Sequence, residues 1–96
     1  MTIEKLSKAK REEILRVAAK HGARNVRLFG SAARGEASDA SDLDFLVEME
    51  PGRSLLDLVA LRNDLMDLLG REVDVVSEDG LYWLLRRKIL REARPL

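Results

Sequence analysis

The sequence contains no cysteine and a single histidine. The absence of cysteine excludes a disulfide scaffold, a thiolate zinc site and a cysteine nucleophile, and it fits a reducing compartment. The lone histidine, His21, cannot build a histidine-rich metal centre. Because His21 precedes Gly22 at the end of a helical stretch, we expect its ring to meet helix carbonyl groups.

An excess of one charge and a long apolar run are also missing. Lys and Arg number 17, as do Asp and Glu, so the formal net charge is zero. This balance argues against a protein that binds nucleic acid or membranes by long-range attraction. Residues 1–11 are charged, unlike a signal peptide, and no segment approaches transmembrane length. We therefore expect a cytoplasmic protein without a membrane partner or direct nucleic-acid binding.

Apolar periodicity and turn residues predict the architecture. The chain is long enough for a small core, so we expect a single domain over residues 1–96. The predicted helices span 7–21, 31–34, 54–69 and 81–93, and the predicted strands span 26–29, 42–48 and 72–76. The order α-β-α-β-α-β-α is that of an α/β fold, in which a short mixed sheet of about three strands packs against helices.

Local signals support these helices. Ser7 is placed as an N-cap, and Ser54 with Asp57 three residues later resembles a capping box. The helix after Ser54 has an apolar stripe made of Leu55, Leu58, Val59, Leu65, Met66 and Leu69. In the last helix we expect Leu81, Leu84 and Leu85 to face inward, with Pro95 beyond the helix end.

A glycine-bounded turn is followed by two alternating carboxylates. The turn is Gly30-Ser31-Ala32-Ala33-Arg34-Gly35, and Asp42-Leu43-Asp44 begins ten residues beyond Ser31. Exposed backbone N–H groups in such a turn can hold phosphate, and two carboxylates on one face of a strand suit a hard cation such as magnesium. Either half alone is also typical of an exposed loop, whereas their combination indicates nucleotidyl transfer.

A third acid, Asp74, lies within the apolar segment Val73-Asp74-Val75-Val76. A carboxylate in such a strand is costly to bury unless something compensates it. If this strand lies beside the strand of Asp42 and Asp44, Asp74 can join the same metal cluster or receive a proton from an attacking hydroxyl. The alternative is an edge-strand residue that faces water.

The spacing from Gly30-Ser31 to Asp42-Leu43-Asp44 resembles the signature of the DNA polymerase beta-type nucleotidyltransferase superfamily. More narrowly, the segments 28–35 and 41–45 resemble the minimal nucleotidyltransferases, the MntA-type antitoxins that are paired with HEPN-domain ribonuclease toxins. The similarity extends from the first helix to residues 89–93. It implies the small nucleotidyltransferase fold for this chain.

The resemblance also implies roles for individual residues. Asp42, Asp44 and Asp74 match the catalytic metal ligands, which hold two Mg2+ ions. Gly30, Ser31 and Arg34 match the nucleotide-binding positions that face the triphosphate. In this branch, ATP is the donor and a tyrosine hydroxyl of the cognate HEPN toxin is the acceptor, so the toxin is adenylylated. The resemblance allows a homo- or a hetero-oligomer.

Two other functions fit the sequence. The chain can act as a non-catalytic antitoxin that masks its toxin by contact, through its leucine-rich helix or its basic last helix. It can also act as a nucleotidyltransferase on a small molecule or an RNA end, although the chain has no room for an acceptor-binding domain. The basic residues of the last helix are either a solvated face or a contact for an acidic partner or the nucleotide: Arg86, Arg87, Lys88, Arg91 and Arg94.

Overall fold

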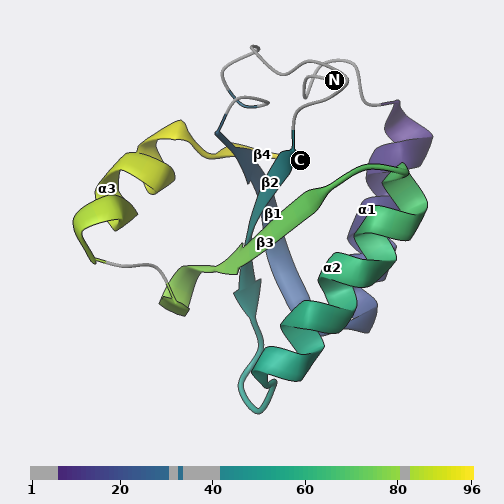
Figure 1. Cartoon of the computed structure of the whole chain (residues 1–96), viewed down its shortest axis with the longest axis horizontal. Helices are drawn as coiled ribbons and strands as arrows, with labels where there is room; N and C mark the ends of the chain where they lie inside the picture. Colours follow the sequence, from purple (N-terminus) through teal and green to yellow (C-terminus); the bar gives the residue numbers. More distant parts are fainter. Residues whose placement is uncertain (1–6, 31–32, 34–41, 81–82) are drawn as a thin grey trace.

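The computed structural model describes residues 7–30, 33, 42–80 and 83–96. In this part of the chain the elements follow one another in the order shown in Figure 1. They are α1 (Lys8–Lys20), β1 (Ala23–Phe29), β2 (Leu43–Met49), α2 (Leu55–Leu69), β3 (Val73–Ser77), the 3-10 turn η2 (Glu78–Gly80), α3 (Trp83–Glu92) and β4 (Arg94–Pro95).

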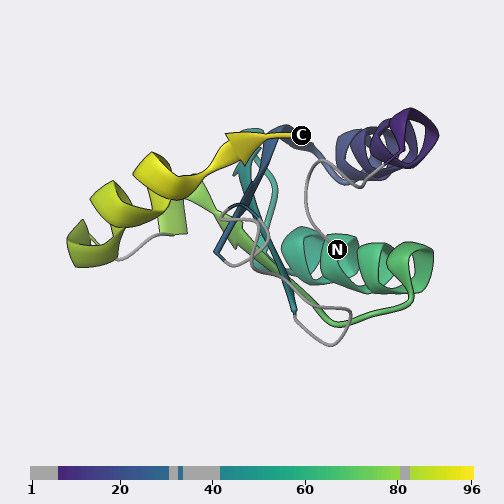
Figure 2. The same ribbon diagram turned by 90° about the horizontal axis from the view of Figure 1, so that it is seen from above.

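The strands form one mixed sheet in the order β3-β2-β1-β4. Strand β1 pairs antiparallel with β2 and β4, whereas β2 and β3 are parallel and are connected through α2. A parallel pair requires such a crossover, because the chain must return to the end at which it started. Figures 1 and 2 show α1 and α2 side by side on one side of the sheet and α3 on the other side. The predicted α/β fold is therefore confirmed.

The core lies between the sheet and the pair α1 and α2. Leu43, Phe45 and Val47 are fully buried on one face of β2, as the alternation predicts. They pack in one cluster with residues of the two helices and the neighbouring strands: Ile14, Ala18, Ala23, Val26, Leu28, Leu61, Leu65 and Val73. The opposite face of β2 is thereby left for Asp44 and Leu46.

The predicted helix caps are confirmed. The Ser7 hydroxyl accepts a hydrogen bond from the backbone N–H of Lys10 at 3.1 Å. At the start of α2, the Ser54 backbone N–H donates to the Asp57 carboxylate at 2.8 Å, which completes a capping box. This bond lowers the pKa of Asp57 below its ordinary value. Both caps use groups only three residues apart, which explains why sequence alone finds them.

Strand β1 begins at Ala23, three residues before the predicted strand, and it contains an irregularity. The register with β2 shifts between Arg24 and Arg27, and Asn25 has a positive φ of 50°. An extra residue at a bulge inverts the alternation of side chains. Ala23 and Val26 therefore both face the core although they are three residues apart. Neither this bulge nor β4 was predicted from the sequence.

The apolar stripe predicted for α2 was wrong in part. Leu65 is buried, but Leu55 is 73% exposed and Val59 is 45% exposed, whereas Leu61, absent from the predicted stripe, is fully buried. With roughly 100° of rotation per residue, Leu55 and Val59 lie about 120° to 160° around the helix from Leu61. The buried face is centred on Leu61 and Leu65, so the first turn of α2 presents leucine to solvent.

Some predictions concern residues outside the described part. These are the helix over 31–34, the loop over 36–41 and the inward side chains of Leu81, Leu84 and Leu85. Among the described helices, none combines the length and the apolar character needed to cross a bilayer.

His21 joins the two helices that cover the sheet. Its ring nitrogen Nε2 donates to the Asp64 Oδ2 of α2 at 2.6 Å, and this hydrogen bond is the main reason that the pKa of Asp64 is lowered from 3.8. A carboxyl with a lowered pKa in the folded state stabilises the fold above its unfolded pKa, and this contribution is lost as the pH falls through the folded pKa.

We therefore expect Asp64→Asn to lower the thermal midpoint of unfolding at neutral pH. Below about pH 4, the midpoint of this variant should fall less steeply with pH than that of the wild type. The measurement is the thermal midpoint followed by circular dichroism over an acid titration. Asp67→Asn, on the exposed side of the same helix, is the control and is expected to behave like the wild type. Parallel titration curves for the wild type and Asp64→Asn would contradict the role assigned to this pair.

Candidate functional site

The first two candidate acids lie at the start of β2. Asp42 immediately precedes the strand and is exposed, and Asp44 is partly buried within it. Because Leu43 and Phe45 point into the core, Asp44 points to the opposite face, together with Leu46. The alternation predicted for this strand is thus observed. It keeps the carboxylate of Asp44 out of the apolar core.

The third acid is brought beside Asp44 by the parallel pairing of β2 and β3. Asp44 and Asp74 are direct partners in the register, as are Leu43 and Val73. Partners in adjacent strands lie about 5 Å apart and send their side chains to the same face. Asp74 is exposed on that face. The strand of Asp74 therefore lies beside the strand of Asp44, which was the condition for a shared site, and the Asp74 side chain is exposed to solvent.

Gly30 is packed directly against the carboxylate of Asp44. It follows Phe29, which is the register partner of Asp44 on the other side of β2. A Cβ atom built on Gly30 would collide with Asp44 Oδ2, and the backbone of Gly30 has φ +73°. Both the space and the left-handed conformation favour glycine. The turn and the acid, fourteen positions apart, thus form one contact.

Carboxylate oxygens from Asp42, Asp44 and Asp74 are the ligand type that Mg2+ prefers. Among the described residues, however, no three acidic or histidine side chains are grouped closely enough to hold a metal ion by themselves. Magnesium is commonly held by one or two carboxylates together with substrate phosphates and water. The register pair Asp44 and Asp74 fits that mode of binding, and the three-acid metal site stays a prediction.

Two predicted nucleotide-binding residues, Ser31 and Arg34, lie outside the described part of the chain. Of the turn between Gly30 and Gly35, the structure describes Gly30 and Ala33, and Ala33 is buried. The contact of Gly30 with Asp44 is therefore the structural observation that ties this turn to the acids.

An ion-pair network that was not predicted from the sequence lies on the same face of the sheet. Arg27 of β1 donates to the Glu78 Oε2 at 2.8 Å, and both side chains are largely buried. Arg86 of α3 donates to the Glu78 backbone carbonyl at 3.1 Å and approaches Oε1 at 3.4 Å. Glu78 thus connects β1 with α3 through its contacts with Arg27 and Arg86. No spacing in the sequence indicates a contact between residues 51 positions apart.

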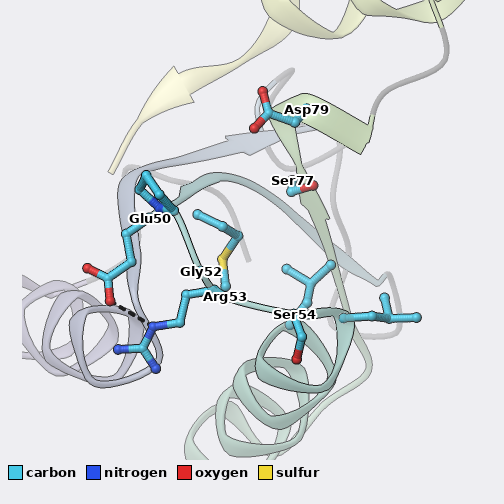
Figure 3. A pocket seen from close by; sticks show the side chains of 10 residues that line it. Glu50, Gly52, Arg53, Ser54, Ser77 and Asp79 are labelled. Atoms are coloured by element: carbon cyan, nitrogen blue, oxygen red, sulfur yellow. Dashed lines mark hydrogen bonds and ion pairs between the residues drawn. The ribbon is translucent and has the colours of Figure 1, made fainter.

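A cavity of about 520 Å3 lies at the other end of β2. Figure 3 shows the side chains that line it. The turn before α2 forms one wall, and there Glu50 and Arg53 pair at 2.7 Å. Ser77 and Asp79 line the cavity as well. Met49 is five residues after Asp44, which corresponds to about 17 Å along a strand. The cavity is therefore separate from the three predicted acids.

Comparison with known proteins identifies relatives that cover most of the chain. A family model described as "Nucleotidyltransferase domain" matches residues 8–96. The chain is 45% identical to "Putative protein adenylyltransferase MJ0435" of Methanocaldococcus jannaschii, over 86% of this chain and 89% of that protein. It is 42% identical to "Protein adenylyltransferase MntA" of Thermococcus cleftensis, over 74% of this chain and 72% of that protein.

Solved structures have the same fold. One described as a "putative minimal nucleotidyltransferase" matches with a TM-score of 0.86 and 55% identity, over 100% of this chain and 97% of that chain. Another, described as "the toxin-antitoxin with AMP-PNP", matches with a TM-score of 0.76 over 94% of this chain and 72% of that chain. At 22% identity the second likeness shows the fold alone.

The contact between Gly30 and Asp44 can be tested by two matched substitutions. Gly70 has a similar φ of +64°, but a Cβ there would meet nothing within 4 Å. Gly70→Ala should therefore cost only the left-handed strain, about 1–2 kcal/mol. We expect Gly30→Ala to reduce the free energy of unfolding by more than Gly70→Ala, because Asp44 must also move. Denaturant unfolding of both variants measures the difference, and equal losses would exclude the tight contact.

Proposed function

The chain belongs to the nucleotidyltransferase domain family and to its minimal, MntA-like members, and from this premise we propose that it is a magnesium-dependent protein adenylyltransferase. In this proposal it transfers AMP from ATP to a hydroxyl group, most simply a tyrosine hydroxyl, of a cognate HEPN ribonuclease toxin. The observation that carries the proposal is the arrangement of Gly30, Asp44 and Asp74 on one face of the sheet.

This arrangement suits a reaction that needs positioning and charge neutralisation more than a protein nucleophile. Asp44 and Asp74 are register partners, so a cation between their carboxylates would reduce the repulsion between the two charges. Asp42, two residues before Asp44 and just outside β2, would be the third acid of the site. Two Mg2+ ions held by these acids would lower the pKa of the acceptor hydroxyl and neutralise charge on the triphosphate.

The proposed step is an in-line displacement at the α-phosphorus of ATP. The acceptor oxygen forms a new P–O bond, and the bond from phosphorus to the oxygen bridging the α- and β-phosphates breaks. Pyrophosphate leaves with that bond pair, and in this proposal Asp74 takes the proton of the acceptor hydroxyl. Gly30 and the residues after it, Ser31 and Arg34, would hold the phosphates.

The proposed partner is supported by what similar proteins are called. One relative is named protein adenylyltransferase MntA, and a structure of the same fold is described as a toxin-antitoxin with AMP-PNP. These words concern those proteins, and for this chain the toxin, its HEPN fold, ATP as donor and a cytoplasmic location belong to the proposal. The competing function is an antitoxin that neutralises its toxin by contact alone.

We expect Asp44→Asn to reduce transfer of AMP to the toxin by on the order of a thousandfold, because ligand and charge neutralisation are lost together. The chain, ATP, magnesium and the toxin are incubated, and intact-mass spectrometry measures the added AMP. Asp79→Asn is the matched control, since Asp79 is an exposed acid of the cavity at the far end of β2. It should transfer AMP at nearly the wild-type rate.

Two outcomes would decide against this assignment. If Asp79→Asn abolishes transfer and Asp44→Asn does not, the reaction belongs to the far cavity. If both variants and the wild type suppress toxin activity equally and the mass of the toxin does not increase, the chain neutralises the toxin by contact and not by catalysis. A pull-down of the toxin with Asp44→Asn, in which the complex is retained, separates loss of chemistry from loss of binding.

A further inference from the structure

Helix α3 presents an arginine-lined hollow that the proposed reaction does not use. The hollow has a volume of about 580 Å3 and is lined by Arg86, Arg87, Leu90 and Arg91. Arg86 and Leu90 are four residues apart, as are Arg87 and Arg91, so the two pairs form adjacent stripes on the helix surface. The three arginines are exposed and Leu90 is partly buried between them. None of the described lining residues is a carboxylate.

The charge of the chain is divided unequally. Residues 83–96 carry five basic side chains and one acidic side chain, whereas the remaining sequence has four more acidic than basic residues. The zero net charge therefore conceals a basic helix on an acidic body. Figure 2 shows that α3 lies on the opposite side of the sheet from α1 and α2. The basic surface is thus separate from the helices that cover the core.

The orientation of this surface is fixed by the network around Glu78. Arg86 contacts both the backbone carbonyl and the carboxylate of Glu78, whose other oxygen is held by Arg27 of the sheet. The guanidinium of Arg86 is consequently positioned before any partner arrives. Because Arg86 anchors α3 to the sheet through Glu78, the helix face that carries Arg87 and Arg91 loses less freedom when a partner binds, which favours recognition.

We propose that this face of α3 docks an acidic segment of a partner protein, with carboxylates opposite Arg87 and Arg91 and an apolar side chain over Leu90. Arginine binds carboxylates through two parallel hydrogen bonds, and an apolar centre with a charged rim is typical of protein interfaces. Nucleic acid fits less well, because the acidic body repels a long polyphosphate chain and Leu90 offers it nothing. Within the proposed function, and resting on it, the acidic segment belongs to the toxin.

The test uses the full chain and a labelled peptide in which glutamates flank a central leucine, with fluorescence anisotropy as the readout. The same peptide with lysine in place of glutamate and a labelled single-stranded RNA are the comparison probes. We expect the acidic peptide to bind in preference to both, and Arg91→Glu to weaken its binding by about tenfold or more. Arg87→Glu is expected to behave in the same way.

Lys88→Glu is the matched control, because Lys88 is exposed on the same helix but does not line the hollow. It should weaken binding by less than roughly threefold, since exposed charges outside a contact are screened. If Lys88→Glu and Arg91→Glu weaken peptide binding equally, the binding is due to general charge attraction, and the proposal is overturned. Equal binding of the lysine peptide, or preferential binding of the RNA, would overturn it as well. Unchanged thermal midpoints confirm that the variants are folded.

A second readout connects the surface to catalysis. If the toxin supplies the acidic segment, Arg91→Glu should raise the KM for the toxin and leave the KM for ATP unchanged. Unchanged KM values for both substrates would remove the toxin as the occupant. Failure of the wild type to transfer AMP would count against the proposed function alone, because the peptide experiment decides the docking surface without any transfer.

Discussion

The in-register parallel pairing of β2 with β3 is the constraint on which the candidate site depends. It places Asp44 beside Asp74 on one face while Leu43, Phe45 and Val73 enter the core on the other. A shift of one residue would turn acids into the core and leucines to solvent, which the buried face forbids. The apolar packing that stabilises the fold therefore also fixes the strand register that places the two carboxylates side by side.

The sequence predicts the parts of this fold that depend on near neighbours. The caps at Ser7 and Ser54 and the alternation around Asp44 involve groups within a few residues, and the structure has them. Predictions failed where distant contacts decide the outcome. The bulge at Asn25 lies in the part of β1 that precedes its predicted range, and the burial of Leu61 instead of Leu55 depends on which face of α2 packs against the sheet.

The candidate site divides along the same line. The spacing from Gly30 to Asp44 carries the family resemblance, and their contact in the structure gives a physical reason for a glycine at that position. The partnership of Asp44 with Asp74 could be stated from sequence only as a condition, because nothing local specifies which strands are adjacent. The Arg27, Glu78 and Arg86 network had no sequence signal, since it joins three elements that are far apart in the chain. The family resemblance indicated the chemistry, whereas the ion pairs that connect the sheet with α3 could be found only in the structure.

The short strand β4 has a consequence for the behaviour of the molecule in concentrated solution. Arg94 and Pro95 pair with Leu28 and Arg27 at the edge of the described sheet, and the backbone N–H of Leu96 donates to Val26. An open strand edge is a template on which other chains can aggregate, and proline has no N–H group with which to extend a ladder. A strand of only two residues that ends in proline thus blunts this edge, so that a sheet rich in valine and leucine is protected there against growth into a fibre.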